Sequence, residues 1–488
     1  MAAQLADPAI TAVFCQRELL DHGQGAGRRP VSRHCAVIDV GKTHVKLHLL
    51  DDALNCRARL SRDNPVLCGP PYPHYDIDGL WRWMCAGLAQ FAAAAHIDRL
   101  AVTTHGACAA LLDPAAGAAG LALPVMDYEF EHVARDADYA ALRPAFAQTF
   151  SPALPAGLNL GRQLSWQRRH HRAQFERAHL LLPYPQYWAW RLTGRAVAEF
   201  TSWGCHTDLW APAARDYSDL VDALGLRDKL PPLVGAGEVV GALSAEVAAQ
   251  TGLPGDCRVV AGVHDSNASY LRYLGRGSAG AFTVVSTGTW VITFASGASL
   301  SALDERRDML ANVDINGDPV PCARFMGGRE FQAICARSGA AAADAFSAAD
   351  VQRVIDDGVL ALPDFSGGSG PFGGRAPCIQ GGSASGPALA SLYCALMLDY
   401  ELELLRATGD IVIEGAWLRN APLCALLAQL RPRRAVRLSR DATGTVSGAA
   451  QLALGVSIPP ALDTATPGAW RGLDEYRRRW RNQLGGAG

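Results

Sequence analysis

The alternation of apolar and polar positions first becomes regular near residue 36. Residues 36–40 are mostly apolar, and residues 44–51 alternate between apolar and polar side chains. A short apolar run indicates a buried strand, and alternation indicates a strand with one buried side. Residues 41–43 between the two runs are small or polar, as in a tight turn. The pattern therefore predicts a β-hairpin over residues 36–51.

The same pattern returns in the second half of the chain. Residues 282–285 form a run rich in apolar residues, residues 286–289 form a small, hydroxyl-rich turn, and residues 290–294 are again mostly apolar. A repeated pattern of this kind is economically explained by an internal duplication. We therefore expect two related halves, each built on one hairpin.

Further runs predict the elements around the two hairpins. Strands are expected over residues 100–104, 258–263 and 411–413. Helices are expected over residues 178–193, 389–408 and 423–429, with a short amphipathic helix over residues 10–20. Strands that alternate with helices are typical of α/β proteins.

The length of the chain indicates more than one domain. It has 488 residues, whereas a single hydrophobic core stops growing at roughly 250–300 residues. We expect an appendage over residues 1–33, a first domain over residues 34–274 and a second over residues 275–488, because glycines cluster near residue 275. A cleft between two domains is the usual place for a small ligand.

Charge and cysteine usage narrow the class of protein. Lys plus Arg (45) nearly equals Asp plus Glu (47), which leaves no basic excess for nucleic acid. The 13 cysteines are scattered without a Cys-x-x-Cys pair, as in a reduced intracellular protein. The N-terminus lacks the apolar core of a secretory signal, and no apolar run is long enough to span a bilayer. We expect a cytoplasmic protein without nucleic-acid or membrane partners, and a homodimer stays open.

The turn at residues 41–43 invites comparison with a P-loop. That motif requires a glycine five positions before its second glycine, and Ala36 stands there. What remains is a β-turn whose backbone N–H groups and Thr43 hydroxyl can meet phosphate oxygens, with Asp39 placed to hold Mg²⁺ through water. Such a turn alone is more often a simple hairpin. The second turn at residues 286–289 favours a clamp around a triphosphate.

Asp265 ends the predicted strand over residues 258–263 and precedes a polar run that can begin a helix. A carboxylate is electrostatically favoured at a helix start, so a capping role is one interpretation. The other is a general base that accepts a hydroxyl proton during phosphoryl transfer. The local sequence leaves both open.

Other reaction classes find no support. The glycines at residues 368, 370 and 373 match a dinucleotide fingerprint, but they follow no strand, and Pro377 prevents the required helix. Neither a Gly-x-Ser-x-Gly elbow nor a tandem cysteine pair occurs. Serine hydrolases and zinc enzymes are therefore excluded.

Taken in order, the motifs resemble those of the FGGY carbohydrate kinases in the actin-like, hexokinase-like ATPase superfamily. The resemblance covers nearly the whole chain after residue 34, through residues 39–46, 104–113, 124–129, 262–265, 286–290 and 414–420. It implies two actin-like (ribonuclease H-like) α/β domains with a catalytic cleft between them. It also implies transfer of phosphate from ATP, with Mg²⁺, to a small carbohydrate. A weaker likeness to the rhamnulokinase and fuculokinase branch implies a ketopentose or 6-deoxyketohexose such as rhamnulose, fuculose or xylulose.

The resemblance also implies roles for single residues. Asp265 would be the catalytic base, and Asp39 the Mg²⁺ ligand. The sugar would be bound by Thr104, His105, Asp127, Tyr128, Glu129, His264 and Asp265. ATP would be bound by Gly41, Lys42, Thr43, Lys46, Thr287, Gly288, Thr289, Gly415, Ala416 and Asn420.

Some positions depart from the family pattern. Lys42 replaces a usually small residue, Tyr128 and Glu129 replace an Asp-x-Arg-like pair, and Ala416 replaces a second glycine. These changes leave open which sugar is bound and whether Lys42 contacts phosphate. The alternative function is a non-catalytic sensor of sugar and nucleotide on the same fold, which has no need of a base at Asp265.

Overall fold

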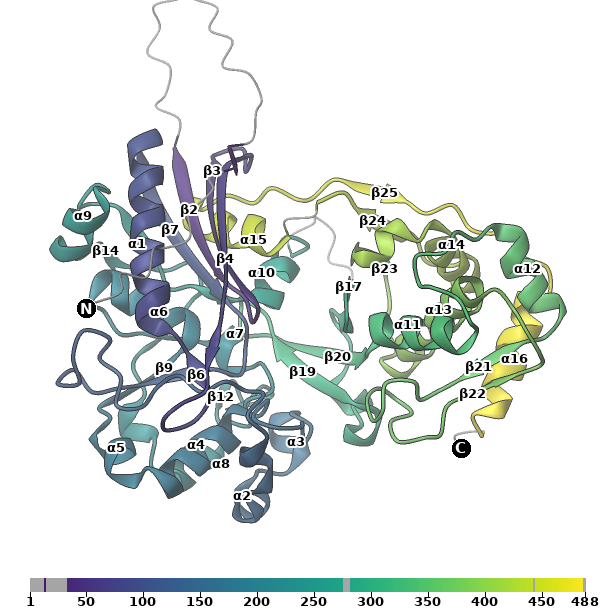
Figure 1. Cartoon of the computed structure of the whole chain (residues 1–488), viewed down its shortest axis with the longest axis horizontal. Helices are drawn as coiled ribbons and strands as arrows, with labels where there is room; N and C mark the ends of the chain where they lie inside the picture. Colours follow the sequence, from purple (N-terminus) through teal and green to yellow (C-terminus); the bar gives the residue numbers. More distant parts are fainter. Residues whose placement is uncertain (1–12, 15–32, 275–280, 442–443, 486–488) are drawn as a thin grey trace, which may run out of the picture.

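A computed structural model describes residues 13–14, 33–274, 281–441 and 444–485 of the chain. Its described part contains two large β-sheets, each packed against helices (Figure 1). Of the helix predicted over residues 10–20, only Val13 and Phe14 are described, and they form a short strand, β1 (Val13–Phe14), paired with β4. The rest of that prediction lies outside the described residues.

The first sheet contains the first predicted hairpin. Its strand order is β1-β4-β3-β2-β7-β15-β14, and β16 also pairs with β7. The bounds are β2 His34–Val40, β3 His44–Asp51, β4 Cys56–Asp63, β7 Ile97–Thr104, β14 Val239–Ala242, β15 Arg258–Val260 and β16 Val263–His264. Strands β15, β16 and β2 all run parallel to β7. Carboxyl ends of parallel strands meet at one sheet edge, the usual place for a ligand.

The second sheet repeats this arrangement. Its order is β19-β20-β18-β17-β23-β24-β25. The bounds are β17 Phe282–Thr287, β18 Val291–Ala295, β19 Met309–Val313, β20 Pro319–Phe325, β23 Asp410–Gly415, β24 Val436–Ser439 and β25 Leu462–Thr464. Strands β17 and β18 form an antiparallel hairpin beside the parallel strand β23, as β2 and β3 do beside β7. The common pattern supports the predicted duplication.

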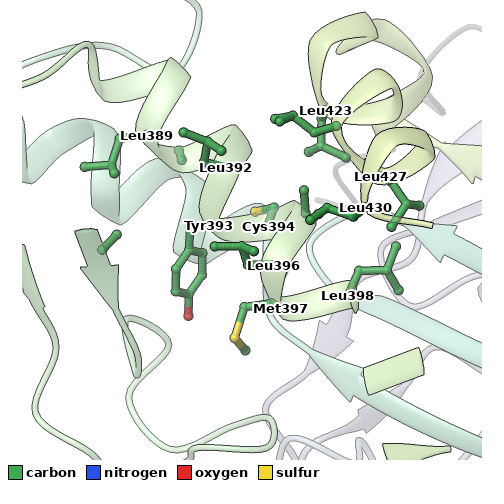
Figure 2. Close-up of a cluster of buried hydrophobic side chains, with 14 of the residues drawn as sticks. Leu389, Leu392, Tyr393, Cys394, Leu396, Met397, Leu398, Leu423, Leu427 and Leu430 are labelled. Carbon is green, nitrogen blue, oxygen red and sulfur yellow. The ribbon is translucent and has the colours of Figure 1, made fainter. Parts of the chain in front are cut away.

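Helices pack against the second sheet and form a leucine-rich core with it. The main ones are α11 Gly327–Arg337, α12 Ala348–Asp356, α13 Gly386–Leu404, α14 Ala421–Leu430 and α16 Leu473–Gln483. Figure 2 shows Leu392 and Leu396 of α13 and Leu427 of α14 in one cluster of buried side chains, and all three are almost completely buried. Burying such side chains supplies most of the favourable free energy of folding.

Two predicted elements are interrupted. The helix expected over residues 178–193 is a strand, β9 Leu180–Pro183, followed by helix α6 Tyr184–Thr193. Proline is tolerated in a first helical turn but not inside a helix, so Pro185 stands at the start of α6. The strand expected over residues 258–263 divides into β15 and β16, because Gly262 adopts a φ of 92°.

Both faces of the first sheet are covered (Figure 1). Helix α1 (Ile77–Ala94) shares a core with Ile38 of β2, whereas α15 (Gly444–Leu454) packs against Val37 on the opposite face. Burial on both faces explains the nearly continuous apolar run of β2. The predicted domain division between residues 274 and 275 stays a prediction, and α15, although it follows that point, packs on the first sheet.

Helix α10 (Asp265–Leu271) is held closely between α15 and the second sheet. A Cβ atom at Gly448 of α15 would lie 1.7 Å from the Ala268 carbonyl oxygen of α10. At the other side, Arg272 donates to Glu414 of β23 at 2.6 Å, and the Ser269 hydroxyl donates to Glu414 at 2.8 Å. These contacts fix the helix that begins with Asp265.

The close packing of α10 and α15 gives a test of the fold. Glycine to alanine inside a helix usually stabilises by about 1 kcal/mol, but Gly448→Ala is expected to destabilise by about 1–3 kcal/mol, because backbone atoms cannot move aside cheaply. Denaturant unfolding measures the change. Gly255→Ala is the control, since no atom lies within 4 Å of an added Cβ there. A stabilised Gly448→Ala variant would show that the two helices pack less closely.

Candidate active site

A cavity of about 620 Å³ lies where α10 meets the second sheet. Asp265 of α10 and Gly415 of β23 both line it, and the Asp265 side chain is 33 % exposed. The further lining residues are Ser266, Ser269, Ser286, Glu414, Ala416, Leu418, Arg419, Asp441, Gly444 and Thr445. Asp265, the predicted catalytic base, therefore lines the same cavity as two predicted ATP ligands, Gly415 and Ala416.

A second cavity, of about 570 Å³, adjoins the first through Ala416 and Arg419. It includes Gly288 and Asn420, both predicted ATP ligands, together with Phe331 and Trp417. An apolar pocket with a few polar groups next to a polar cavity suits a ligand with a flat ring and a charged tail. Arg419, which the sequence analysis did not single out, lines both cavities.

Thr287 and Asn420 have structural contacts of their own. The Thr287 hydroxyl donates to the Glu414 carbonyl oxygen at 2.5 Å and accepts from the Trp417 N–H at 3.0 Å. Asn420 caps α14 by accepting from the Leu423 N–H at 3.1 Å. Thr289 is exposed in the turn after Gly288. The hydroxyl of Thr287 thus joins β17 to β23, and the turn that follows contributes Gly288 to the second cavity.

Gly415 is a position where only glycine suits the backbone. Its φ is 89°, and an added Cβ would lie 2.1 Å from the Thr287 carbonyl oxygen. Side chains other than glycine rarely adopt this conformation. The chain can therefore turn sharply at the end of β23 and expose its backbone to the cavity.

Asp39, near the end of β2, is a buried carboxylate that pairs with one cationic side chain among the described residues. Lys46 lies 3.5 Å from it across the hairpin. Burial raises the pKa of Asp39 to about 6, Lys46 opposes that rise, and the charge of Asp265 adds to it. A cation bound near Asp39 would oppose this rise of its pKa. Residues 13–14, 33–274, 281–441 and 444–485 contain no cluster of three or more metal-binding side chains. In proteins, Mg²⁺ is usually held by one or two carboxylates together with phosphates and water.

The first turn directs Lys42 toward the predicted sugar residues. Its ammonium group is hydrogen-bonded to Asp127, lies 3.3 Å from Glu129, and stands 4.9 Å from the centre of the Tyr128 ring. Gly41 closes the turn by donating to the His44 carbonyl oxygen at 2.9 Å, and Thr43 is exposed. Lys42 and its three acidic and aromatic neighbours form one cluster, although the sequence grouped Lys42 with the phosphate ligands.

His105 follows β7 and is surrounded by aromatic rings. The ring centres of Tyr75, Tyr128 and Tyr184 lie 5.3–5.5 Å from its own. Burial lowers the pKa of His105 to about 4, although the hydrogen bond to the Gly106 carbonyl and the negative charge of Asp265 both oppose this change. The ring is therefore neutral. Its Nδ1 lies 2.9 Å from the Gly106 carbonyl oxygen and donates to it, which leaves Nε2 as an acceptor.

The Nε2 atom of His105 is buried without a hydrogen-bond partner among the described residues. A buried polar atom without a partner is costly and marks a place where a ligand can supply one. The Thr104 hydroxyl, in contrast, is completely buried and donates to the His105 carbonyl oxygen at 2.9 Å. His105 is therefore better placed than Thr104 to meet a sugar hydroxyl.

His264 lies between Asp265 and a residue that the sequence analysis did not select, Cys205. The His264 Nε2 atom is 3.2 Å from Asp265 Oδ1 and 3.4 Å from Cys205 Sγ. Cys205 is 59 residues away in sequence, and no spacing motif joins it to His264. Glu199 is another buried group that the sequence analysis did not select as a site residue. Burial raises the pKa of Glu199 to about 7, although the hydrogen bond from the Thr201 hydroxyl opposes this rise.

Two protein-family models match the chain. The model described as "FGGY family of carbohydrate kinases, N-terminal domain" matches residues 35–271. The model described as "Carbohydrate kinase FGGY, C-terminal domain" matches residues 279–461. Together they include every predicted site residue.

Solved structures agree over almost the whole chain. A carbohydrate kinase from Novosphingobium aromaticivorans is 36% identical and has a TM-score of 0.83, over 94% of this chain and 100% of that one. A xylulose kinase from Lactobacillus acidophilus has a TM-score of 0.74 over 93% of this chain and 99% of that one, and at 15% identity it shows the fold alone. The predicted α/β architecture of two actin-like domains is thereby confirmed.

A curated relative matches a shorter segment. The L-fuculokinase of Escherichia coli (strain K12) is 27% identical over 274 residues, which cover 54% of this chain and 57% of that protein. This chain thus spans little more than half the length of the curated relative. Among the residues that the structure describes, no helix has the length and apolar character needed to cross a lipid bilayer.

Proposed function

Since this chain belongs to the FGGY family of carbohydrate kinases, we propose that it transfers the γ-phosphate of ATP to a hydroxyl group of a small sugar, with Asp265 as the general base. The observation that supports this most is the position of Asp265. It lines the cavity of Gly415 and Ala416, and its charge acts on His105 and Tyr128 on the other side. A base for this reaction must stand between nucleotide and acceptor.

The nucleotide would occupy the two joined cavities. The base and ribose would lie near Asn420 and Trp417, and the phosphates would extend past Gly288, Gly415 and Ala416 toward Asp265. From the other side, the turn of Gly41 and Thr43 with Lys46 would approach the terminal phosphate. When bound, Mg²⁺ neutralises phosphate charge, and Asp39 is the residue that would hold it through water.

The sugar would bind on the side of the first sheet. His105 offers a free acceptor at Nε2, Asp127 offers a carboxylate, and Tyr128 offers a ring face. Asp265 would accept the proton of the attacking hydroxyl as the bond to phosphorus forms. Closing the cleft around both ligands would exclude water and limit hydrolysis of ATP.

We propose a ketopentose or a 6-deoxyketohexose as the substrate, such as fuculose, rhamnulose or xylulose. The names of two relatives support this class, since one is an L-fuculokinase and another an L-xylulose/3-keto-L-gulonate kinase. We further propose a cytoplasmic location, because the 13 cysteines are scattered along the sequence without a Cys-x-x-Cys pair, as expected in a reduced intracellular protein. A homodimer stays an open proposal.

An ATP-consumption screen across ketoses, aldoses and polyols, with Mg²⁺ present, tests this function. We expect a strong response to one or a few ketoses. The alternative, a sensor without catalysis, would bind sugar and ATP in calorimetry while no sugar stimulates ATP use. That combined result would overturn the proposal.

Lys42 gives a prediction about the sugar side. Because its ammonium group contacts Asp127 and Glu129, Lys42→Met should raise the KM for the sugar roughly tenfold and leave the KM for ATP within about twofold. Steady-state kinetics with each substrate varied measures both constants. Lys229→Met is the matched control, because Lys229 bonds only to the backbone carbonyls of Glu176 and Ala178 in the described structure. A selective rise in the KM for ATP would instead assign Lys42 to phosphate binding.

A further inference from the structure

A buried pair of side chains lies directly behind Asp265. Cys205 is 3% exposed and His264 is 5% exposed, and neither lines the two cavities described above. Their closest atoms, Cys205 Sγ and His264 Nε2, are 3.4 Å apart. The same Nε2 atom is 3.2 Å from Asp265 Oδ1. One ring nitrogen therefore meets both the thiol sulfur and the proposed base.

The other ring nitrogen of His264 carries a proton. The Asn267 side chain donates from its Nδ2 atom to the Val313 carbonyl oxygen, which fixes the orientation of the amide. Its Oδ1 atom consequently faces His264 Nδ1 at 2.7 Å as an acceptor. Because an amide oxygen only accepts, Nδ1 must be the donor.

The carboxylate next to Nε2 favours a proton there as well. An ionised carboxylate only accepts hydrogen bonds, so an unprotonated Nε2 would face Asp265 Oδ1 lone pair to lone pair. With protons on both nitrogens the ring is a cation, and the sulfur beside it is favoured as a thiolate. The ring thus stands between two potential anions.

Electrostatics around the pair agree with this assignment. Burial lowers the pKa of His264, but the charges of Cys205 and Asp265 outweigh it, so that the net shift is upward. Burial raises the pKa of Cys205, but His206 and His264 lower it by more, so that the net shift is downward. The other titratable groups facing His264 are Glu199, through the Thr201 hydroxyl, and neutral His105.

The arrangement leaves one oxygen of the base available. The Ser266 N–H donates to Asp265 Oδ1 at 2.6 Å, and His264 approaches the same oxygen. Every hydrogen bond that the described residues give this carboxylate goes to Oδ1. A carboxylate held by one oxygen directs the other toward the cavity, where the sugar hydroxyl would be.

We propose that Cys205 and His264 form a buried thiolate–imidazolium pair that positions the carboxylate of Asp265 for proton transfer. This role rests on the proposed kinase function and assigns His264, predicted above as a sugar ligand, to positioning instead. The thiolate keeps the imidazolium charged, and the imidazolium holds Oδ1. Neither residue touches the reacting atoms.

The test is the pH profile of kcat for the full-length protein. The wild type should keep a level kcat from neutral to alkaline pH, because the thiolate retains the proton of His264. In Cys205→Ser the histidine should lose its proton near its usual pKa, and kcat should fall at least about tenfold between mildly acidic and alkaline pH. The KM for ATP should stay within about twofold. Cys257→Ser, another fully buried cysteine away from the site, is the control.

A second variant and a second measurement separate the possible outcomes. His264→Gln should lower kcat roughly 10–100-fold at every pH, without the alkaline fall. Subtracting the ultraviolet spectrum of Cys205→Ser from that of the wild type at neutral pH should show thiolate absorbance. A wild type that phosphorylates sugar while Cys205→Ser keeps its profile would overturn the pair but not the kinase. A wild type without kinase activity would overturn the proposed function, and the spectrum alone would then decide whether the thiolate exists.

Discussion

Asp265→Ala is expected to lower turnover by roughly 10²–10⁴-fold while leaving ATP affinity nearly unchanged. The side chain is the only carboxylate of α10 and lines the cavity shared with Gly415 and Ala416, where the proposed mechanism needs a base. ATP affinity should persist because Asp265 is one of many residues that line the first cavity and does not line the second, and the rest of both cavities stays unchanged. Single-turnover kinetics and calorimetry with ATP measure the two quantities.

The matched variant is Asp265→Asn, which keeps an oxygen for the Ser266 N–H but removes the base. It should lose turnover as strongly as the alanine variant and retain the thermal stability of the wild type. Asp463→Ala, at an exposed ion pair with Arg440, should have no effect on either. If turnover survives both changes at Asp265, the assignment of the base is wrong.

Local patterns were enough to predict the two hairpins. Residues 36–51 and 282–294 combine apolar runs with small polar turns, and both fold into antiparallel pairs, β2–β3 and β17–β18. The strand pattern is clear in the sequence for two reasons. Strand β2 is buried on both faces and is therefore almost continuously apolar, and the alternation of apolar and polar residues in β3 repeats every two residues. Each turn also contains the small and hydroxyl side chains on which the phosphate-binding prediction rests.

Long-range packing could not be predicted in this way. The position of α15 on the first sheet depends on Gly448 meeting Ala268, two residues far apart in the sequence. The strand β9 within the predicted helix over residues 178–193 forms because Ala109–Leu112 supplies a partner, β8. A single sequence carries the propensity of each segment but not the identity of its neighbour.

The candidate site shows the same division. Asp39 lies near the end of β2, and His105 and Asp265 directly follow β7 and β16. Because the carboxyl ends of these parallel strands meet, the nearness of the three residues could be inferred from the sequence. The direction of Lys42 could not, since its turn permits either a phosphate or a sugar contact. The role of Cys205 could not be inferred either, because nothing in the sequence distinguishes it from the other cysteines, and only the fold places it beside His264.

Asp39→Asn is expected to lower turnover on the order of 10²-fold at moderate Mg²⁺ concentration, with partial recovery as Mg²⁺ is raised. Asparagine keeps the shape of the side chain but removes the negative charge that would hold the cation through water. Lys46, 3.5 Å away, would also lose its partner and add an unbalanced positive charge where the metal should lie. Steady-state kinetics over a range of Mg²⁺ concentrations measures the effect.

Asp63→Asn separates this effect from a general loss of charge on the same sheet. Asp63 stands at the end of β4, pairs with His44 at 3.4 Å and is 88% exposed, so its variant should retain the Mg²⁺ dependence of the wild type. An Asp39→Asn protein with unchanged turnover at every Mg²⁺ concentration would place the cation elsewhere. Since Asp39 is the buried carboxylate next to the turn of the first hairpin, the phosphate-binding interpretation of that turn would then lose its main support.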